Sequence, residues 1–110
     1  MQFNEYQELA RRTQNAKLAC VERRLHALHG IAAEAGEING RYQKTYQGHA
    51  LDVDKVIDEM GDLMWFISEL ADVLRVSLDN IAEHNVAKLR KRYPDGFSEN
   101  RSVYREEVDE

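Results

Sequence analysis

The sequence predicts an all-α protein, a four-helix, bundle-like protomer that assembles with a partner subunit. Apolar residues recur at the spacing of a helix along most of the chain. Pro94 is the only proline, and no stretch shows the apolar alternation between turn residues that is typical of strands. The chain has 110 residues with an apolar share of 43%, which fits one small domain at residues 1–97 and a charged tail at 98–110.

Two helices are expected in the first half of the chain, over roughly 3–16 and 20–44, each with apolar residues on one face. These are Phe3, Tyr6, Leu9, Ala10 and Thr13 in the first helix, and Leu25, Leu28, Ile31, Ala32, Ala35 and Ile38 in the second. Ala27 and Gly30 are small and would let another backbone or a bound ion approach closely. The stretch TYQGHALD, which contains Gly48, then breaks the pattern.

A third helix is expected over roughly 54–75, with Asp52 or Asp54 available as its N-cap. Its apolar residues cover more than half of its circumference, and a helix of that kind is normally buried. A four-helix chain of this size has little material to cover it, so we expect a homodimer or a homotetramer. Trp65 lies on the remaining side, where a subunit interface would favour a tryptophan.

A fourth helix is expected from Ser77, its N-cap, to the residue before Pro94. Asn85 and Arg92 lie inside its apolar arc, and Lys88 lies at the border. Lys88 alone is explained by a long side chain that reaches past the core to solvent. Three such donors together favour a set that binds phosphate. The tail that follows is charged and aperiodic, so we expect it to be mobile or to lie against a neighbour.

Charge and composition exclude several classes of protein. The net charge of -5 argues against a general nucleic-acid binder. Cys20 is the only cysteine, which leaves no internal disulfide and no thiol cluster for zinc. The N-terminus lacks the apolar core of a secretory signal, and the longest apolar run, LMWFI, is too short to span a bilayer. We therefore expect a cytoplasmic protein that binds neither nucleic acid nor membrane.

Acidic residues three apart share a helix face, and this spacing alone carries little weight. Six such pairs occur in the sequence, against about three or four expected by chance. Four of the pairs fit a solvated acidic surface. One of these four is Glu69 with Asp72, which we place on the polar side of the third helix.

The other two pairs stand where a solvated acid is not expected. Glu59 lies inside the apolar arc of the third helix with Asp62 at its edge. Glu34 borders the apolar arc of the second helix, and Glu37 lies further round. If these helices pack together, four carboxylates converge in a partly dry groove, and a divalent cation would compensate their charge.

The chemistry of this set favours Mg²⁺, with Mn²⁺ as a possible substitute. All the candidate ligands are oxygen atoms, which suit these two ions, and Mg²⁺ takes substrate phosphates as further ligands. No histidine follows a glutamate by three residues, so the pattern of di-iron bundles is missing. Direct ion pairs between acidic and basic side chains remain the alternative interpretation.

Three stretches carry a resemblance to a known family. HGIAAEAGEI, VIDEMGDLMWF and NVAKLRKRYPDGF resemble, in order and spacing, the signatures of MazG-like nucleoside triphosphate pyrophosphohydrolases. EYQELARRT and KTYQGH are similar to the opening helix and central loop of small, single-domain members. The resemblance covers roughly residues 3–98. Ala33 replaces a glycine that is common in the family, which is a mild change.

The resemblance implies an all-α enzyme, a dimer or a dimer of dimers, that cleaves a nucleoside triphosphate between its α- and β-phosphates. The products would be a nucleoside monophosphate and pyrophosphate, and the role would be clearance of unwanted nucleotides. The implied Mg²⁺ ligands are Glu34, Glu37, Glu59 and Asp62, with Glu34 preferred as the base that activates water. The residues implied to face the triphosphate are Lys44, Asn85, Lys88 and Arg92.

Two other functions stay open. The first is a pyrophosphatase specific for dUTP or dCTP, because such enzymes share this all-α family. The second is a non-catalytic dimerisation or regulatory module, in which the four acids pair with Arg41, Lys88 and Arg92. For Trp65 two roles stay open: a place in a subunit interface, which we favour, or a surface on which a nucleobase stacks.

Overall fold

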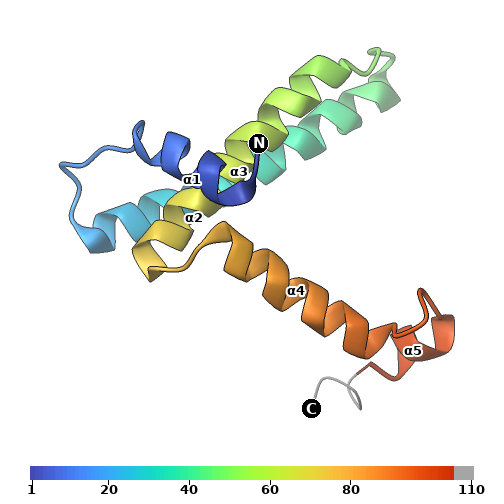
Figure 1. Ribbon diagram of the computed structural model, residues 1–110. Coiled ribbons are helices and arrows are strands. Elements are labelled where there is room, and N and C mark those ends of the chain that lie inside the picture. Colours follow the sequence, from blue (N-terminus) through green and yellow to red (C-terminus); the bar gives the residue numbers. More distant parts are fainter. Residues whose placement is uncertain (106–110) are drawn as a thin grey trace.

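The computed structural model describes residues 1–105, and this part of the chain is all-α (Figure 1). Its elements are α1 (Phe3–Arg11), α2 (Cys20–Gln43), the short 3₁₀ helix η1 (Lys44–Gln47), α3 (Val53–Leu74), α4 (Leu78–Arg92) and α5 (Glu99–Val103). Within residues 1–105 there is no strand beyond one isolated bridge. The prediction of an all-α fold with four main helices is confirmed. No helix in this part of the chain is long and apolar enough to cross a membrane.

Side-chain caps mark the first residues of α3 and α4. Asp52, rather than Asp54, caps α3 by accepting from the backbone N–H of Lys55 at 3.3 Å. Ser77 caps α4 as predicted, accepting from the N–H of Asn80 at 3.0 Å. Such a bond satisfies one of the backbone donors that a helix start leaves without an intrahelical partner.

Two predictions of local structure are wrong. The first helix ends at Arg11 instead of residue 16, because the hydroxyl of Thr13 donates to the carbonyl of Ala10 at 2.7 Å and replaces a helical bond. The tail contains the short helix α5, which Ser98 caps by accepting from the N–H of Arg101 at 3.3 Å. The rest of the predicted aperiodic tail, residues 106–110, lies outside the described part of the chain.

Helices α2 and α3 form a long antiparallel hairpin that is the centre of the molecule (Figure 1). They approach closely because Ala27 is fully buried and Gly30 offers no side chain, so the ring of Phe66 lies directly against the α2 backbone. The close approach predicted from these two small residues is therefore observed.

Helix α1 lies against α3 and fixes the corner at which α4 begins. Gln7 is 4% exposed, and its amide nitrogen donates to Asp72 Oδ1 at 2.9 Å and to the carbonyl of Val76 at 3.1 Å. Its amide oxygen accepts from the N–H of Leu78 at 2.8 Å, at the first turn of α4. One buried side chain from α1 therefore ties the end of α3 to the start of α4.

From this corner α4 runs away from the hairpin instead of packing alongside it (Figure 1). The expected side-by-side bundle of four helices is therefore not formed within one chain. Leu78 is buried at the corner, but Ile81, Val86 and Leu89 on the apolar arc of α4 are all more than 40% exposed. An apolar face of this kind is left without a partner inside the protomer.

The prediction that Glu69 and Asp72 lie on a solvated surface is wrong. Glu69 is 1% exposed, and the side chain of Asp72 is 8% exposed. Asp72 accepts from Arg11 at 2.8 Å and from Gln14 at 2.7 Å, as well as from Gln7. Burial alone would raise the pKa of Asp72, but the hydrogen bonds from Arg11, Gln7 and Gln14 outweigh it, so the pKa falls below its usual value.

Candidate metal centre

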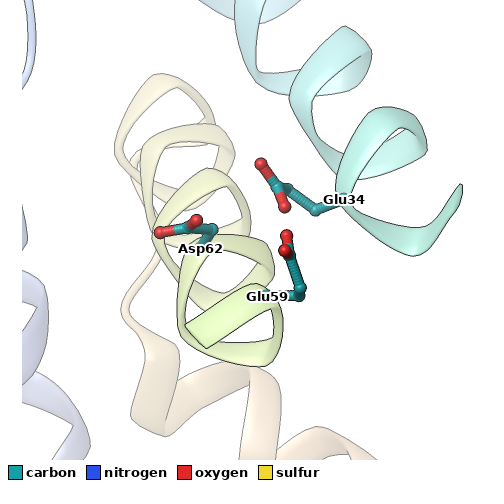
Figure 2. Close-up of side chains that lie close together, drawn as sticks. All are labelled: Glu34, Glu59 and Asp62. Atoms are coloured by element: carbon teal, nitrogen blue, oxygen red, sulfur yellow. The ribbon is translucent and has the colours of Figure 1, made fainter. Parts of the chain in front are cut away.

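Three of the predicted carboxylates converge across the central hairpin. Glu34 projects from α2, and Glu59 and Asp62 project from α3 (Figure 2). Each contributes one oxygen atom to a group in which all three oxygens lie within 4.8 Å of one another. Figure 2 shows the carboxyl groups of Glu34 and Glu59 pointing toward each other. The three-residue spacing places Glu59 and Asp62 on the same side of α3, as the helical period requires.

The proximity of these acids shifts their protonation. The pKa of Glu34 is raised to about 7, first by a hydrogen bond with Glu59, then by burial, and then by the charges of Asp62, Glu59 and Glu37. The pKa of Glu59 is lowered by the same hydrogen bond and by one from Arg41. Oε2 of Glu34 is buried and has no partner among the described residues. The hydrogen bond to Glu59 thus favours a proton on Glu34, and a divalent cation could take the place of that proton.

Arg41 accounts for part of the stability of Glu59 in its apolar surroundings. One of its terminal nitrogens lies 3.2 Å from Oε1 of Glu59, and the side chain of Glu59 is 14% exposed. This is one of the ion pairs expected of a non-catalytic module. It leaves Glu34 and Asp62 without a basic partner among the described ion pairs.

The fourth predicted ligand, Glu37, lies outside the three-carboxylate group. It is exposed and sits one turn further along α2, and its charge still contributes to the raised pKa of Glu34. With Arg41 and Lys44 it lines a separate pocket of about 240 Å³. Lys44, predicted to face phosphate, is exposed at the start of η1. The structure thus places Glu37 and Lys44 together, beside the three carboxylates but not among them.

The remaining predicted phosphate-binding residues, Asn85, Lys88 and Arg92, lie on α4 and are not brought to the carboxylates within one chain. Asn85 and Lys88 are exposed and line a pocket of about 790 Å³ on α4 itself. Asp62 stands twelve residues, or about 18 Å, before the end of α3. From that end α4 diverges from the hairpin, so it does not run alongside the carboxylates of its own chain (Figure 1).

Another pocket adjoins the carboxylates, and several of the residues that line it were not predicted from the sequence to belong to the site. It measures about 550 Å³ and is lined by Thr13, Asn15, His26, Glu34, Asp62, Trp65 and Phe66. Trp65 donates from Nε1 to the hydroxyl of Thr13 at 2.7 Å, so its own chain holds it. No sequence pattern indicates that Thr13 and Asn15 belong to this pocket. They lie in the loop after α1, and only the fold brings them to it.

An all-α scaffold whose central hairpin brings three carboxylates together defines a class of helical proteins equipped to hold a divalent cation. Comparison with known families shows to which family within this class the chain belongs. The profile of the MazG nucleotide pyrophosphohydrolase domain matches residues 3–97, and the chain belongs to this family. The resemblance drawn from the three sequence stretches is thereby confirmed.

A curated relative is the gene 37 protein of Mycobacterium phage L5. It is 35% identical over 72 residues, an alignment that covers 57% of this chain and 60% of the phage protein. The chain thus matches somewhat more than half of the length of that relative. No solved structure matches the chain.

Proposed function

We propose that this protein is a Mg²⁺-dependent nucleoside triphosphate pyrophosphohydrolase. It adds water across the anhydride bond between the α- and β-phosphates of a (deoxy)nucleoside triphosphate and releases the monophosphate and pyrophosphate. Its role would be clearance of nucleotides from the pool. The observation that carries the proposal is the convergence of Glu34, Glu59 and Asp62 on a scaffold that belongs to the MazG family.

The donor set fits a hard divalent cation. Three carboxylate oxygens within 4.8 Å of one another provide the ligand type that Mg²⁺ and Mn²⁺ prefer, and Glu37 is close enough in sequence to add a fourth. A divalent ion held by these residues would neutralise charge on phosphate oxygens and lower the pKa of water. The buried, unpartnered Oε2 of Glu34 supports this assignment, because an orphaned oxygen in that position is costly unless a ligand or ion satisfies it.

Glu34 is the proposed base. A general base works best when its pKa lies near the working pH, and in the absence of a cation the pKa of Glu34 is about 7. It would accept a proton from the water that attacks the anhydride, while the leaving pyrophosphate takes up negative charge. Basic side chains that face the triphosphate would stabilise that charge.

We place those basic side chains on two copies of the chain. Lys44 lies beside Glu37 in the same protomer. Asn85, Lys88 and Arg92 would reach the phosphates from α4 of a second copy, since α4 leads away from the carboxylates of its own chain. The exposed apolar residues of α4 and those of α3 (Ile57, Met60, Met64 and Ile67) support an assembly of two or four copies.

Mixing two defective variants tests this arrangement. We expect Lys88→Ala to lower pyrophosphate release about 10- to 100-fold without changing the melting temperature, because Lys88 is exposed. When it is mixed and reassembled with inactive Glu59→Gln, half of the dimers contain both chains and one of their two sites is intact. The mixture should then recover about one quarter of the wild-type activity. No recovery, or a monomeric mass by light scattering, would contradict the shared site.

Metal binding should depend on pH through Glu34. Its pKa in the folded protein is about 7, above the value of 4.5 of the unfolded chain. Its contribution to stability is therefore present below pH 4.5 and lost as the pH rises through 7. Mg²⁺ requires the ionised form, so calorimetry should show about tenfold tighter binding at pH 8 than at pH 6, with proton release. Glu34→Gln should remove this dependence, and affinity that does not change with pH in the wild type would argue against Glu34 as a ligand.

A panel of nucleoside triphosphates tests the function as a whole. Pyrophosphate and monophosphate should appear only with Mg²⁺ or Mn²⁺. Turnover confined to dUTP or dCTP would favour the narrower enzyme. Absence of turnover with every triphosphate, together with no binding of divalent ions, would favour the non-catalytic module, in which the ion pair between Arg41 and Glu59 is purely structural.

A further inference from the structure

Glu69 is the most deeply buried charged residue described, and the proposed reaction makes no use of it. It lies on α3 one turn before Asp72, and it is 1% exposed. Its Oε1 is 2.7 Å from Nδ1 of His26 on α2, and its Oε2 has no partner among residues 1–105. A carboxylate this dry is costly unless it is paired, so its hydrogen bond to His26 requires an explanation.

The bond to Glu69 fixes the orientation of the His26 ring. A carboxylate accepts, so Nδ1 carries the proton of this bond, and the ring cannot turn without breaking it. The ring also makes edge-to-face contacts with Trp65 at 6.2 Å and Phe66 at 5.5 Å between centroids. Nε2 has no hydrogen-bond partner among the described residues, and the side chain of His26 is 46% exposed. A rigidly held imidazole therefore offers one nitrogen to a ligand.

His26 borders the 550 Å³ pocket that adjoins the carboxylates. His26 lines this pocket together with Glu34 and Asp62. It stands eight residues before Glu34 on α2, or about 12 Å along the helix axis. At this separation His26 does not reach a phosphate held at Glu34. It would instead lie near the part of a bound nucleotide that extends beyond the sugar, together with Thr13 and Asn15, which line the same pocket.

We propose that His26 hydrogen-bonds the edge of the substrate's nucleobase through Nε2 and that Glu69 is the positioning residue that holds the ring for this contact. The inference rests on the proposed function, because it assumes that triphosphates bind at the carboxylates. It assigns base selection in part to a histidine–glutamate pair between α2 and α3. It also explains why α3 buries an acid where an apolar residue would pack.

The test compares base preference in the full-length protein. His26→Phe keeps an aromatic ring against Trp65 and Phe66 but removes both ring nitrogens. Glu69→Gln keeps the imidazole but removes the negative charge that orients it. For the preferred base, each should raise KM about tenfold, the loss of one hydrogen bond, while kcat changes little. The spread of kcat/KM across the four bases should narrow by the same factor. Hydrolysis of inorganic tripolyphosphate, or its binding if it is not cleaved, should not change.

A double variant separates positioning from a structural role. If Glu69 acts through His26, Glu69→Gln should have no further effect on base preference in the His26→Phe background. A purely structural pair would lower the melting temperature and leave the base ratios of the folded fraction as in the wild type, and that result would overturn the proposal. His29→Phe is the matched control, because His29 is exposed on the same helix, and it should behave as the wild type.

The two proposals fail in distinguishable ways. If the wild type neither binds nor cleaves any nucleoside triphosphate, the proposed function and this inference both fall. If the wild type cleaves triphosphates and both His26→Phe and Glu69→Gln keep its base ratios, only the role of the histidine–glutamate pair is overturned. Binding of non-hydrolysable analogues of the four bases, measured by calorimetry, gives the same comparison independently of catalysis.

Discussion

Replacing Glu59 with glutamine should abolish Mg²⁺-dependent pyrophosphate release and leave the helices folded. The amide keeps the shape of the carboxyl group but lacks the charge that a cation requires. Removing a group that only orients a metal ligand already lowers metal affinity or activity about 10–100-fold. Removing a metal ligand itself should therefore lower activity more than about 100-fold. Calorimetry on the same variant should show that Mg²⁺ binding is lost.

The melting temperature of Glu59→Gln should stay close to that of the wild type, because two effects on stability oppose each other. Arg41 loses its anionic partner, but its side chain is 27% exposed and solvent screens the charge. Glu34 in turn loses a neighbour that raises its pKa, which relieves repulsion between the two acids. Asp58→Asn, at an exposed acid on the same helix, should keep full activity. A variant that unfolds, from a wild type that binds no divalent ion, would make Glu59 a structural residue.

Much of the helical structure could be predicted from the sequence, because it depends on local chemistry. The apolar spacing identified the four main helices, and side-chain oxygens at Asp52 and Ser77 marked two starts. The convergence of Glu34 on Glu59 and Asp62 was also predictable. It requires only that two amphipathic helices joined by a short loop pack by their apolar faces.

The errors come from contacts between segments distant in sequence. Glu69 appears solvated when α3 is taken alone, but in the fold it is buried and α2 supplies His26 as its partner. The direction of α4 depends on Gln7, whose side chain bonds residues about seventy positions away. No periodicity in α4 contains that information. For the same reason, the prediction that Lys88 faces a triphosphate held at the carboxylates depends on an assembly that one chain does not contain.

Among the glycines of α2, replacement by alanine should destabilise the fold most at Gly30. A Cβ at Gly30 would overlap the ring of Phe66 at Cγ, Cδ1 and Cε1, and no small shift of the ring can avoid it. Overpacking of this kind costs about 1–3 kcal/mol, which exceeds the gain of up to about 1 kcal/mol in helix propensity from alanine. A thermal melt should show a decrease of roughly 5–15 °C for a domain of this size.

Gly36→Ala is the matched control, because it makes the same change on the same helix where nothing lies within 4 Å of the new methyl group. It should stabilise the protein by about 0.5–1 kcal/mol, so the two variants should differ in sign. Phe66→Leu should partly rescue Gly30→Ala by removing ring atoms from the contact. A Gly30→Ala protein as stable as Gly36→Ala would show that α2 and α3 do not pack this closely.

The same substitution should also weaken the metal centre. Phe66 touches α2 at Gly30 and lines the pocket that contains Glu34 and Asp62, and Glu34 lies one helical turn after Gly30. Moving the ring outward would separate α2 from α3 and draw Glu34 away from its two partners. Mg²⁺ affinity of the folded Gly30→Ala protein should therefore fall, while Gly36→Ala leaves it unchanged. Unchanged affinity in both variants would mean that the carboxylates adjust independently of helix spacing, and the centre would not depend on the packing of the hairpin.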